Sequence, residues 1–113
     1  MVQFRETQTD KFTIVKVLDA RLDAKVASEF RQGLVDFIRK GHMFLVLDLS
    51  DVEFSDSSRL GALVSTLKTL GGQGDLVICS IQKPLLVLFE LTRLDRVFRL
   101  FKDSEEAIEV LSR

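Results

Sequence analysis

The sequence predicts an α/β protein: one mixed, largely parallel sheet of four to five strands, with about four helices, in a single domain over residues 1–113. Two observations predict this class. Strand-like and helix-like hydrophobic patterns alternate along the chain, and Met43–Leu49 is a nearly continuous apolar run. Such a run is typical of a strand buried on both faces in a helix-covered sheet, so we expect it near the middle of the sheet.

The chain is expected to begin with two strands and a helix. Phe12–Leu18 alternates β-branched and polar residues, and the weaker segment Val2–Thr7 is its predicted hairpin partner, joined through a turn at residues 8–10. Asp23 is a candidate N-cap for the first helix, and Gly41 ends that helix. Its apolar residues at helical spacing are Val26, Phe30, Leu34, Phe37 and Ile38.

The second half of the chain alternates in the same way. A helix that starts at Ser57 carries an apolar stripe and ends at the glycine cluster of residues 71–74. That cluster follows a helix and precedes a strand, the reverse of a phosphate-binding loop, so we interpret it as a helix end and turn. The remaining predicted elements are a strand at Leu76–Ile81, a helix from Pro84 to Leu91, an edge strand at Val97–Phe101 and a helix starting at Ser104.

Composition narrows the classes of function. With 46% hydrophobic residues, 29% charged residues and one proline, the chain is predicted to be compact. The net charge of −1 creates no global basic field, so protein partners are expected and direct nucleic-acid binding is not. The N-terminus has no basic region followed by a long apolar stretch, and no apolar run approaches the roughly 18 residues of a membrane span. We expect a cytoplasmic protein without membrane contact.

The polar turn Asp56-Ser57-Ser58 joins the central strand region to the second predicted helix. A helix N-terminus has unpaired N–H groups and a partial positive charge, so a serine there can carry a phosphate without unfolding the helix. The turn therefore predicts a phosphorylatable binding module. The alternative is that Asp56 and Ser58 simply cap the helix.

These residues also resemble a known family. The segment LVLDLSDVEFSDSSRLGALV, residues 45–64, is similar to the signature of the STAS domain in bacterial anti-sigma-factor antagonists, in which Asp-Ser-Ser-Gly-Leu-Gly opens a helix. The segments VLDARLD, residues 17–23, and FELTRL, residues 89–94, extend the likeness over essentially the whole chain. The resemblance implies the STAS fold and a regulator that is not an enzyme and needs no cofactor.

The resemblance also implies a mechanism and a site. The unmodified protein would bind an anti-sigma factor that is a serine kinase and so free a sigma factor; phosphorylation of Ser57 would end binding, and a PP2C-type phosphatase would restore it. Ser58, Leu60 and Gly61 would shape the start of the docking helix, with Asp23 beside it. A weak homodimer is left open. The full implied binding set is Asp23, Asp56, Ser57, Ser58, Arg59, Leu60 and Gly61.

Two residues depart from the family pattern. Arg59 stands where the family usually has glycine, and it could pair with a phosphate on Ser57, pair with Asp56, obstruct a standard kinase interface or simply be solvated. Ala20 stands where a glycine is common, which implies a modest change in a turn. Arg59 keeps a second function open: a constitutive STAS interaction subunit of a larger signalling or lipid-transport assembly, without phosphorylation.

Two parts of the sequence resemble pieces of enzyme active sites. Asp48 at the end of an apolar strand resembles the nucleophile of haloacid-dehalogenase-type phosphatases, but Ser50 occupies the position of the required second acid; both are predicted to satisfy backbone groups at the strand end. A Ser57–His42 pair would span the intervening strand, roughly 20 Å, too far for a hydrogen bond.

Other candidate groups are predicted to be structural. Cys79, the one cysteine, lies in an apolar run and is expected to be a buried thiol. No pattern predicts a metal site, since a single histidine and a single cysteine form no ligand cluster. Four late apolar residues are expected in the core, although they would extend a docking surface if exposed. They are Phe89, Leu91, Leu94 and Phe98.

Overall fold

A five-stranded mixed sheet runs through the centre of the computed structural model, which describes residues 2–9, 11–22, 27–55 and 57–113, with backbone only at Ala27, Phe54 and residues 57–59. The strand order is β1-β2-β4-β6-β7. β1 and β2 are antiparallel, and every other neighbouring pair is parallel. The strands are β1 (Phe4–Thr9), β2 (Phe12–Val17), β4 (Phe44–Asp48), β6 (Asp75–Cys79) and β7 (Leu100–Phe101).

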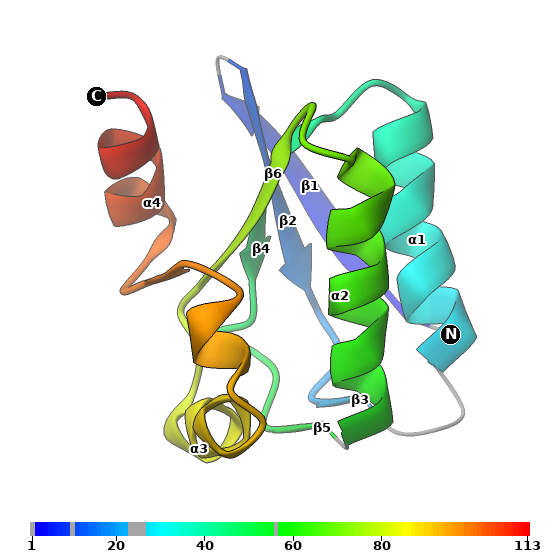
Figure 1. The fold of residues 1–113 in the computed structure, drawn as a ribbon, viewed down its shortest axis with the longest axis vertical. Helices are drawn as coiled ribbons and strands as arrows, with labels where there is room; N and C mark the ends of the chain where they lie inside the picture. The colour runs from blue at the N-terminus through cyan, green and yellow to red at the C-terminus, as the bar shows by residue number, and fades with distance from the viewer. Residues whose placement is uncertain (1, 10, 23–26, 56) are drawn as a thin grey trace.

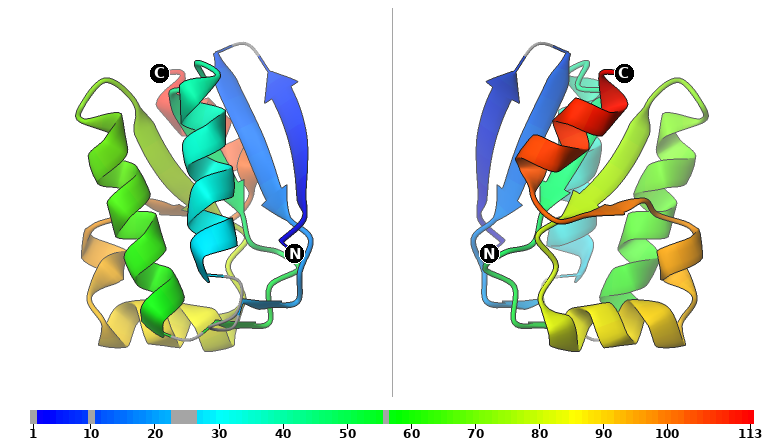
Figure 2. Two further views of the ribbon diagram at one scale, coloured as in Figure 1. Left: turned by 90° about the vertical axis from the view of Figure 1, so that its right-hand side faces the viewer. Right: turned by 90° about the vertical axis from the view of Figure 1, so that its left-hand side faces the viewer.

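Helices cover both faces of this sheet and one of its ends (Figure 1). α1 (Ala27–Arg39) and α2 (Ser57–Leu70) pack side by side on one face, and α4 (Ser104–Leu111) lies on the other (Figure 2). α3 (Lys83–Leu91) crosses the end of the molecule towards which the parallel strands run, and the short 3-10 helix η2 (Leu94–Arg96) follows it. The predicted α/β class with about four helices is confirmed.

The central strand is β4, as its apolar run predicts. Leu45 and Leu47 point into the core beneath α1 and α2, whereas Val46 belongs to the smaller core on the α4 side. All three are at most 1% exposed. On the α4 side, Val46 packs in one cluster with Phe12 and Cys79, which confirms the prediction that Cys79 is a buried thiol.

The first hairpin differs from the prediction in the position of its turn. β1 continues to Thr9, which is the register partner of Phe12, so Gln8 and Thr9 belong to the strand and not to the predicted turn at residues 8–10. The sheet ladder continues through Gln8, the partner of Thr13. The prediction was displaced because polar residues in an exposed edge strand look like turn residues in sequence. Asp10 itself lies outside the described residues.

The C-terminal segment contains a second difference. Only Leu100 and Phe101 of the predicted edge strand pair with β6, because η2 occupies residues 94–96 and buries Phe98 just after it. α4 begins as expected at Ser104, but its N-cap is Asp103, whose carboxylate accepts a hydrogen bond of 2.8 Å from the Glu106 N–H.

A two-stranded parallel sheet that the sequence did not predict lies next to α2. It consists of β3 (Arg21–Leu22) and β5 (Phe54–Ser55), with Arg21 opposite Phe54 and Leu22 opposite Ser55. These strands are too short for any hydrophobic period to be visible. They matter because β5 leads directly into α2.

Glycines end α2 as predicted. Gly71 and Gly72 have positive φ angles of 58° and 83°, the left-handed conformation that glycine adopts at helix ends. Gly74 is required for a different reason, because a Cβ there would overlap the carbonyl group of Met43. The adjacent Asp75 N–H donates a hydrogen bond of 2.9 Å to that same carbonyl.

We therefore predict that Gly74→Ala destabilises the protein by at least about 2 kcal/mol, because backbone atoms must move to admit the methyl group. Gly61→Ala is the matched control: a Cβ at Gly61 meets nothing within 4 Å, so replacing this helical glycine should raise stability by roughly 0.5–1 kcal/mol. Urea unfolding followed by circular dichroism measures both. Equal stabilities of the two variants would contradict the close approach at Met43.

Candidate functional site

The start of α2 is placed by the small β3–β5 sheet. Ser57 is the first residue of α2, and β5 ends two residues before it at Ser55. Ser55 is the register partner of Leu22, and both are buried, at 4% and 3% exposure. The chain segments that precede Asp23 and Asp56 therefore lie side by side. Asp23 and Asp56 themselves are outside the described residues.

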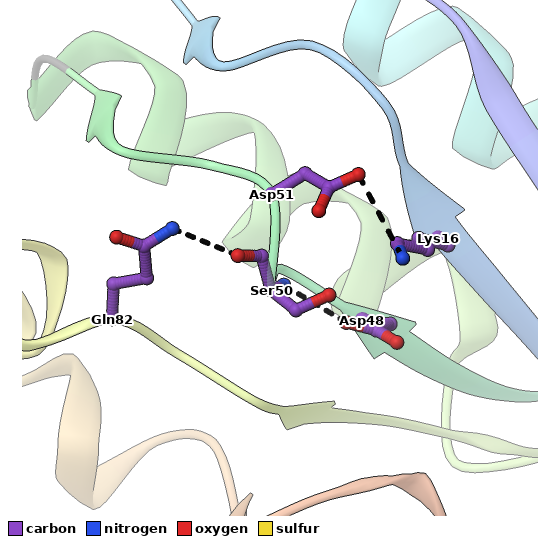
Figure 3. A network of polar contacts seen from close by, with 5 residues as sticks. All are labelled: Lys16, Asp48, Ser50, Asp51 and Gln82. Carbon is purple, nitrogen blue, oxygen red and sulfur yellow. Dashed lines mark hydrogen bonds and ion pairs between the residues drawn. The ribbon is translucent and has the colours of Figure 1, made fainter.

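The loop between β4 and β5 is held by hydrogen bonds from several elements (Figure 3). Gln82, the N-cap residue of α3, donates from Nε2 to the Ser50 carbonyl at 2.8 Å, and the Ser50 N–H donates to Asp48 Oδ1 at 2.9 Å. The latter bond confirms the structural role predicted for Asp48, whereas Ser50 takes part in both bonds through its backbone. From β2, Lys16 Nζ lies 3.7 Å from Asp51 Oδ2 of the same loop.

The same loop is also anchored through its backbone. The Glu53 N–H donates to the Ala20 carbonyl at 2.7 Å, directly before β3, and the Val52 N–H donates to the Leu49 carbonyl at 3.0 Å. Val52 is fully buried. Ala20, one of the two departures from the family pattern, is thus a point of attachment between the segments that enter β3 and β5.

Two residues of the first turns of α2 have opposite roles. Leu60 is 4% exposed and packs in the main core, so it fixes the start of the helix in place. Gly61 is exposed, and the space around its Cβ position is open. A partner backbone can therefore approach the helix closely at Gly61.

The start of a helix such as α2 favours an anion. The first N–H groups of a helix have no acceptor within it, and the aligned peptide dipoles add a partial positive charge. The first turn of α2 contains no acidic residue and includes Arg59. For Ser57, Ser58 and Arg59 the structure gives backbone positions only, so their roles remain predictions.

His42 lies at the opposite end of β4 from the loop that leads to α2. Its Nδ1 is 2.9 Å from Thr13 Oγ1, and its Nε2 is 3.6 Å from Glu6 Oε2. It thus contacts the first hairpin, as a polar residue that follows the end of α1. In the part of the chain that the structure describes, no group of three or more His, Cys, Asp or Glu could hold a metal ion.

One surface feature departs from the sequence interpretation. Phe89 and Phe98 are buried as expected, and Leu94 is partly buried, but Leu91 is 76% exposed. The signal in the sequence was the spacing of four between Val87 and Leu91, which places both on the side of α3 opposite Leu85 and Phe89. Because both faces of this short helix carry apolar residues, the sequence pattern does not show which of them are buried.

The sequence of this chain is similar to a known family model and to known proteins. The STAS domain model matches residues 3–107. An anti-sigma-B factor antagonist of Staphylococcus aureus is 31% identical over 100 residues, which cover 88% of this chain and 92% of that protein. A candidate anti-sigma factor antagonist of Thermotoga maritima is 30% identical over 102 residues, covering 88% of this chain and 90% of that protein.

Solved structures agree. A crystal structure of a candidate anti-sigma factor antagonist from Thermotoga maritima has a TM-score of 0.85 at 30% identity, over 97% of this chain and 95% of that one. The Bacillus protein SpoIIAA in its phosphorylated form shares the fold, with a TM-score of 0.70 at 19% identity over 96% of this chain and 99% of that one.

The chain therefore belongs to the STAS domain family of bacterial anti-sigma-factor antagonists. Members of this family are generally regulators without enzymatic activity, which act by binding anti-sigma factors. Among the residues described here, no helix combines the length and apolar character needed to span a bilayer.

The hydrogen bond from Gln82 to Ser50 gives a first prediction for this site. Gln82→Ala should lower the free energy of unfolding by about 1 kcal/mol, because the half-buried Ser50 carbonyl loses its donor. Amide hydrogen exchange in residues 49–53 should also become faster. The matched control is Gln73→Ala at an exposed position, which should change stability by less than about 0.5 kcal/mol. Unchanged exchange in Gln82→Ala would show that the loop does not depend on this bond.

A second prediction concerns the buried thiol. Burial raises the pKa of Cys79 from 9.0 to about 11. Iodoacetamide at pH 8 should therefore leave the folded protein unlabelled and label it rapidly in urea. Because the folded thiol keeps its proton while the unfolded thiol ionises, its contribution to stability is present below pH 9 and is lost as the pH rises towards 11.

The stability difference between the wild type and Cys79→Ala measures this contribution. It should narrow as the pH rises from 9 to 11. A constant difference over that range, or rapid labelling of the folded protein, would contradict a buried neutral thiol.

Proposed function

We propose that this protein is a phosphorylation-controlled partner switch of the cytoplasm, in which unmodified Ser57 marks the binding surface for an anti-sigma factor that is also a serine kinase. One observation carries the proposal: Ser57 is the first residue of a 14-residue helix. A phosphate there adds nearly two negative charges where the helix dipole tolerates them, so folding should change little.

The effect on a partner is expected to be large. A partner that places a carboxylate or an apolar group against the start of α2 would meet charge repulsion and an unpaired, desolvated phosphate. Such a mismatch weakens binding by on the order of 3 kcal/mol. Release of the anti-sigma factor then ends the antagonism, and a PP2C-type phosphatase would reverse the step. The fold similarity to SpoIIAA, which has been solved in a phosphorylated form, supports a phosphate being compatible with this fold.

The second candidate function is a constitutive interaction subunit. Arg59 favours it, because an arginine in the first turn of α2 replaces the glycine of the family pattern and adds bulk and charge at the proposed interface. In this alternative the start of α2 is still a docking surface, but modification of Ser57 has no regulatory effect.

Ser57→Asp separates the two functions. The switch predicts that this change weakens binding to the anti-sigma factor purified with the wild-type protein from its source cells by roughly tenfold to a hundredfold, measured by calorimetry. Ser112→Asp adds the same charge at an exposed position near the C-terminus and should leave binding unchanged. Mass spectrometry of the protein from growing and stressed cells should find phosphate on Ser57. Equal affinities for wild type and Ser57→Asp would favour the constitutive subunit.

A further inference from the structure

The smaller core, on the α4 side of the sheet, leaves a space unfilled. One helix of eight residues covers this face and packs against β4, β6 and β7. At the end of that helix lies a partly enclosed cavity of about 80 Å³. Protein interiors rarely leave such a space, because the atoms that line it lose packing contacts. A concave apolar space with a few polar groups is the usual form of a small-molecule site.

The lining of this cavity is mostly apolar and carries two charges. The lining residues come from the starts of β2, β4 and β6 and from the last turn of α4. The apolar ones include Phe12, Phe44, Val77 and Leu111, and the charged ones are Lys11 and Asp75. The cavity therefore lies at the end of the molecule opposite to α3 and to the start of α2 (Figure 1).

Lys11 and Asp75 bring opposite charges to the cavity without pairing with each other. Lys11 Nζ lies 5.5 Å from the centre of the Phe12 ring and 5.2 Å from that of Phe44, so the two rings hold its ammonium group. Asp75 is half-buried, and its Oδ1 accepts a hydrogen bond of 2.8 Å from the Leu76 N–H, which fixes the carboxylate at the start of β6. Within the described parts of the chain, neither charged side chain forms an ion pair. A ligand in this cavity therefore meets one positive and one negative group.

These charges select the chemical class of the ligand. An α-amino acid carries a carboxylate and an ammonium group on one carbon, so it satisfies both protein charges at once. A simple carboxylate would bind Lys11 but would face the like charge of Asp75, and a simple amine would face the like charge of Lys11. The apolar remainder of the lining requires an aliphatic side chain, because a polar one would be buried without a hydrogen-bond partner.

The volume of the cavity limits the size of that side chain. An apolar cavity of about 150 Å³ holds benzene, which corresponds to about 25 Å³ per carbon. By this measure the cavity of about 80 Å³ takes roughly three carbons, the size of the valine side chain. The side chain of phenylalanine exceeds the space, and that of alanine leaves most of it empty.

We propose that the cavity between the end of α4 and the starts of β2, β4 and β6 binds a small aliphatic α-amino acid, with valine as the best fit. The Lys11 ammonium group pairs with the ligand carboxylate, and the Asp75 carboxylate pairs with the ligand ammonium group. Phe12, Val77 and Leu111 enclose the aliphatic side chain. The bound ligand thereby joins the last turn of α4 to the sheet. The site is remote from the start of α2, so it stands or falls independently of the proposed function.

Titration of L-valine into the isotope-labelled full chain, followed by NMR, tests this directly. We expect the amide signals of residues 11–12, 44, 75–77 and 111 to shift together and to saturate, while those of residues 85–97 stay unchanged. Phenylalanine should cause no saturable shift at the cavity residues, because its side chain is too large. Absence of a saturable shift with valine up to roughly 20 mM, or saturable shifts confined to other residues, would overturn the proposal.

Two analogues of valine test the charge contacts in the unmodified protein. Isobutyrate lacks the ammonium group, and isobutylamine lacks the carboxylate. Each should bind at least about fivefold more weakly than valine, because each loses one ion pair and places its remaining charge near a like charge. Isobutyrate binding as tightly as valine would show that Asp75 recognises no ammonium group. Isobutylamine binding as tightly as valine would show that Lys11 recognises no carboxylate, and either result would overturn the assignment to an amino acid.

Substitutions at the cavity provide the second test, with valine as the probe. Lys11→Gln removes the positive charge, and Asp75→Asn removes the negative charge but keeps an oxygen that can accept from the Leu76 N–H. Leu111→Phe, at the half-buried end of α4, adds bulk that fills the space. Each change should weaken valine binding at least about fivefold.

The matched controls make the same charge changes at the other end of the molecule. Lys83→Gln at the start of α3 and Asp95→Asn in η2 are at exposed positions and should bind valine like the wild type. Circular dichroism checks that every variant is folded. Wild-type affinity in both Lys11→Gln and Asp75→Asn would overturn the proposal, as would equal losses in the two controls.

Discussion

The rest of the structure depends on the burial of β4 on both faces. Leu45 and Leu47 pack under α1 and α2, and Val46 packs on the α4 side, so a slip of one residue would exchange the two sets and place each in a core that it does not fit. The register of β2 and β6 on β4 is therefore fixed. That register sets where Asp48 ends the strand, and hence where the loop to β5 and α2 begins.

Beyond Asp48 the loop to β5 is held by polar contacts in addition to the buried side chains of Leu49 and Val52, which belong to the main core. Gln82 binds the loop from the start of α3, Lys16 lies near it from β2, and the Ala20 carbonyl accepts from Glu53 just before β3. Contacts from separate parts of the chain thus converge on one short loop. Such a platform suits regulation by added charge, because a partner meets a changed potential on a surface whose shape is already defined.

The sequence predicted the parts of the fold that bury a full face or stripe, because only these leave a visible hydrophobic period. The hydrophobic period correctly predicted the central strand, the four helices and the position of Ser57 at a helix start. β3 and β5 have only two residues each, too few to show a hydrophobic period. Their positions are set by the chain segments that connect them to the main sheet and to α2. Leu91 was expected in the core because the spacing of its apolar neighbours does not reveal where η2 folds back and what it leaves uncovered. The partner contacts of the site depend on a second molecule and stay predictions.

The separation of β3 and β5 from the main sheet has a consequence for local opening. Only two register pairs join these strands, and none of their pairing passes through the five-stranded sheet. We therefore expect this pairing to open locally at a free energy below that of global unfolding, although buried Leu22 ties β3 to the main core. Residues in β3 and β5 then set the free energy of this local opening, while β4 and its neighbours set how long the folded protein persists.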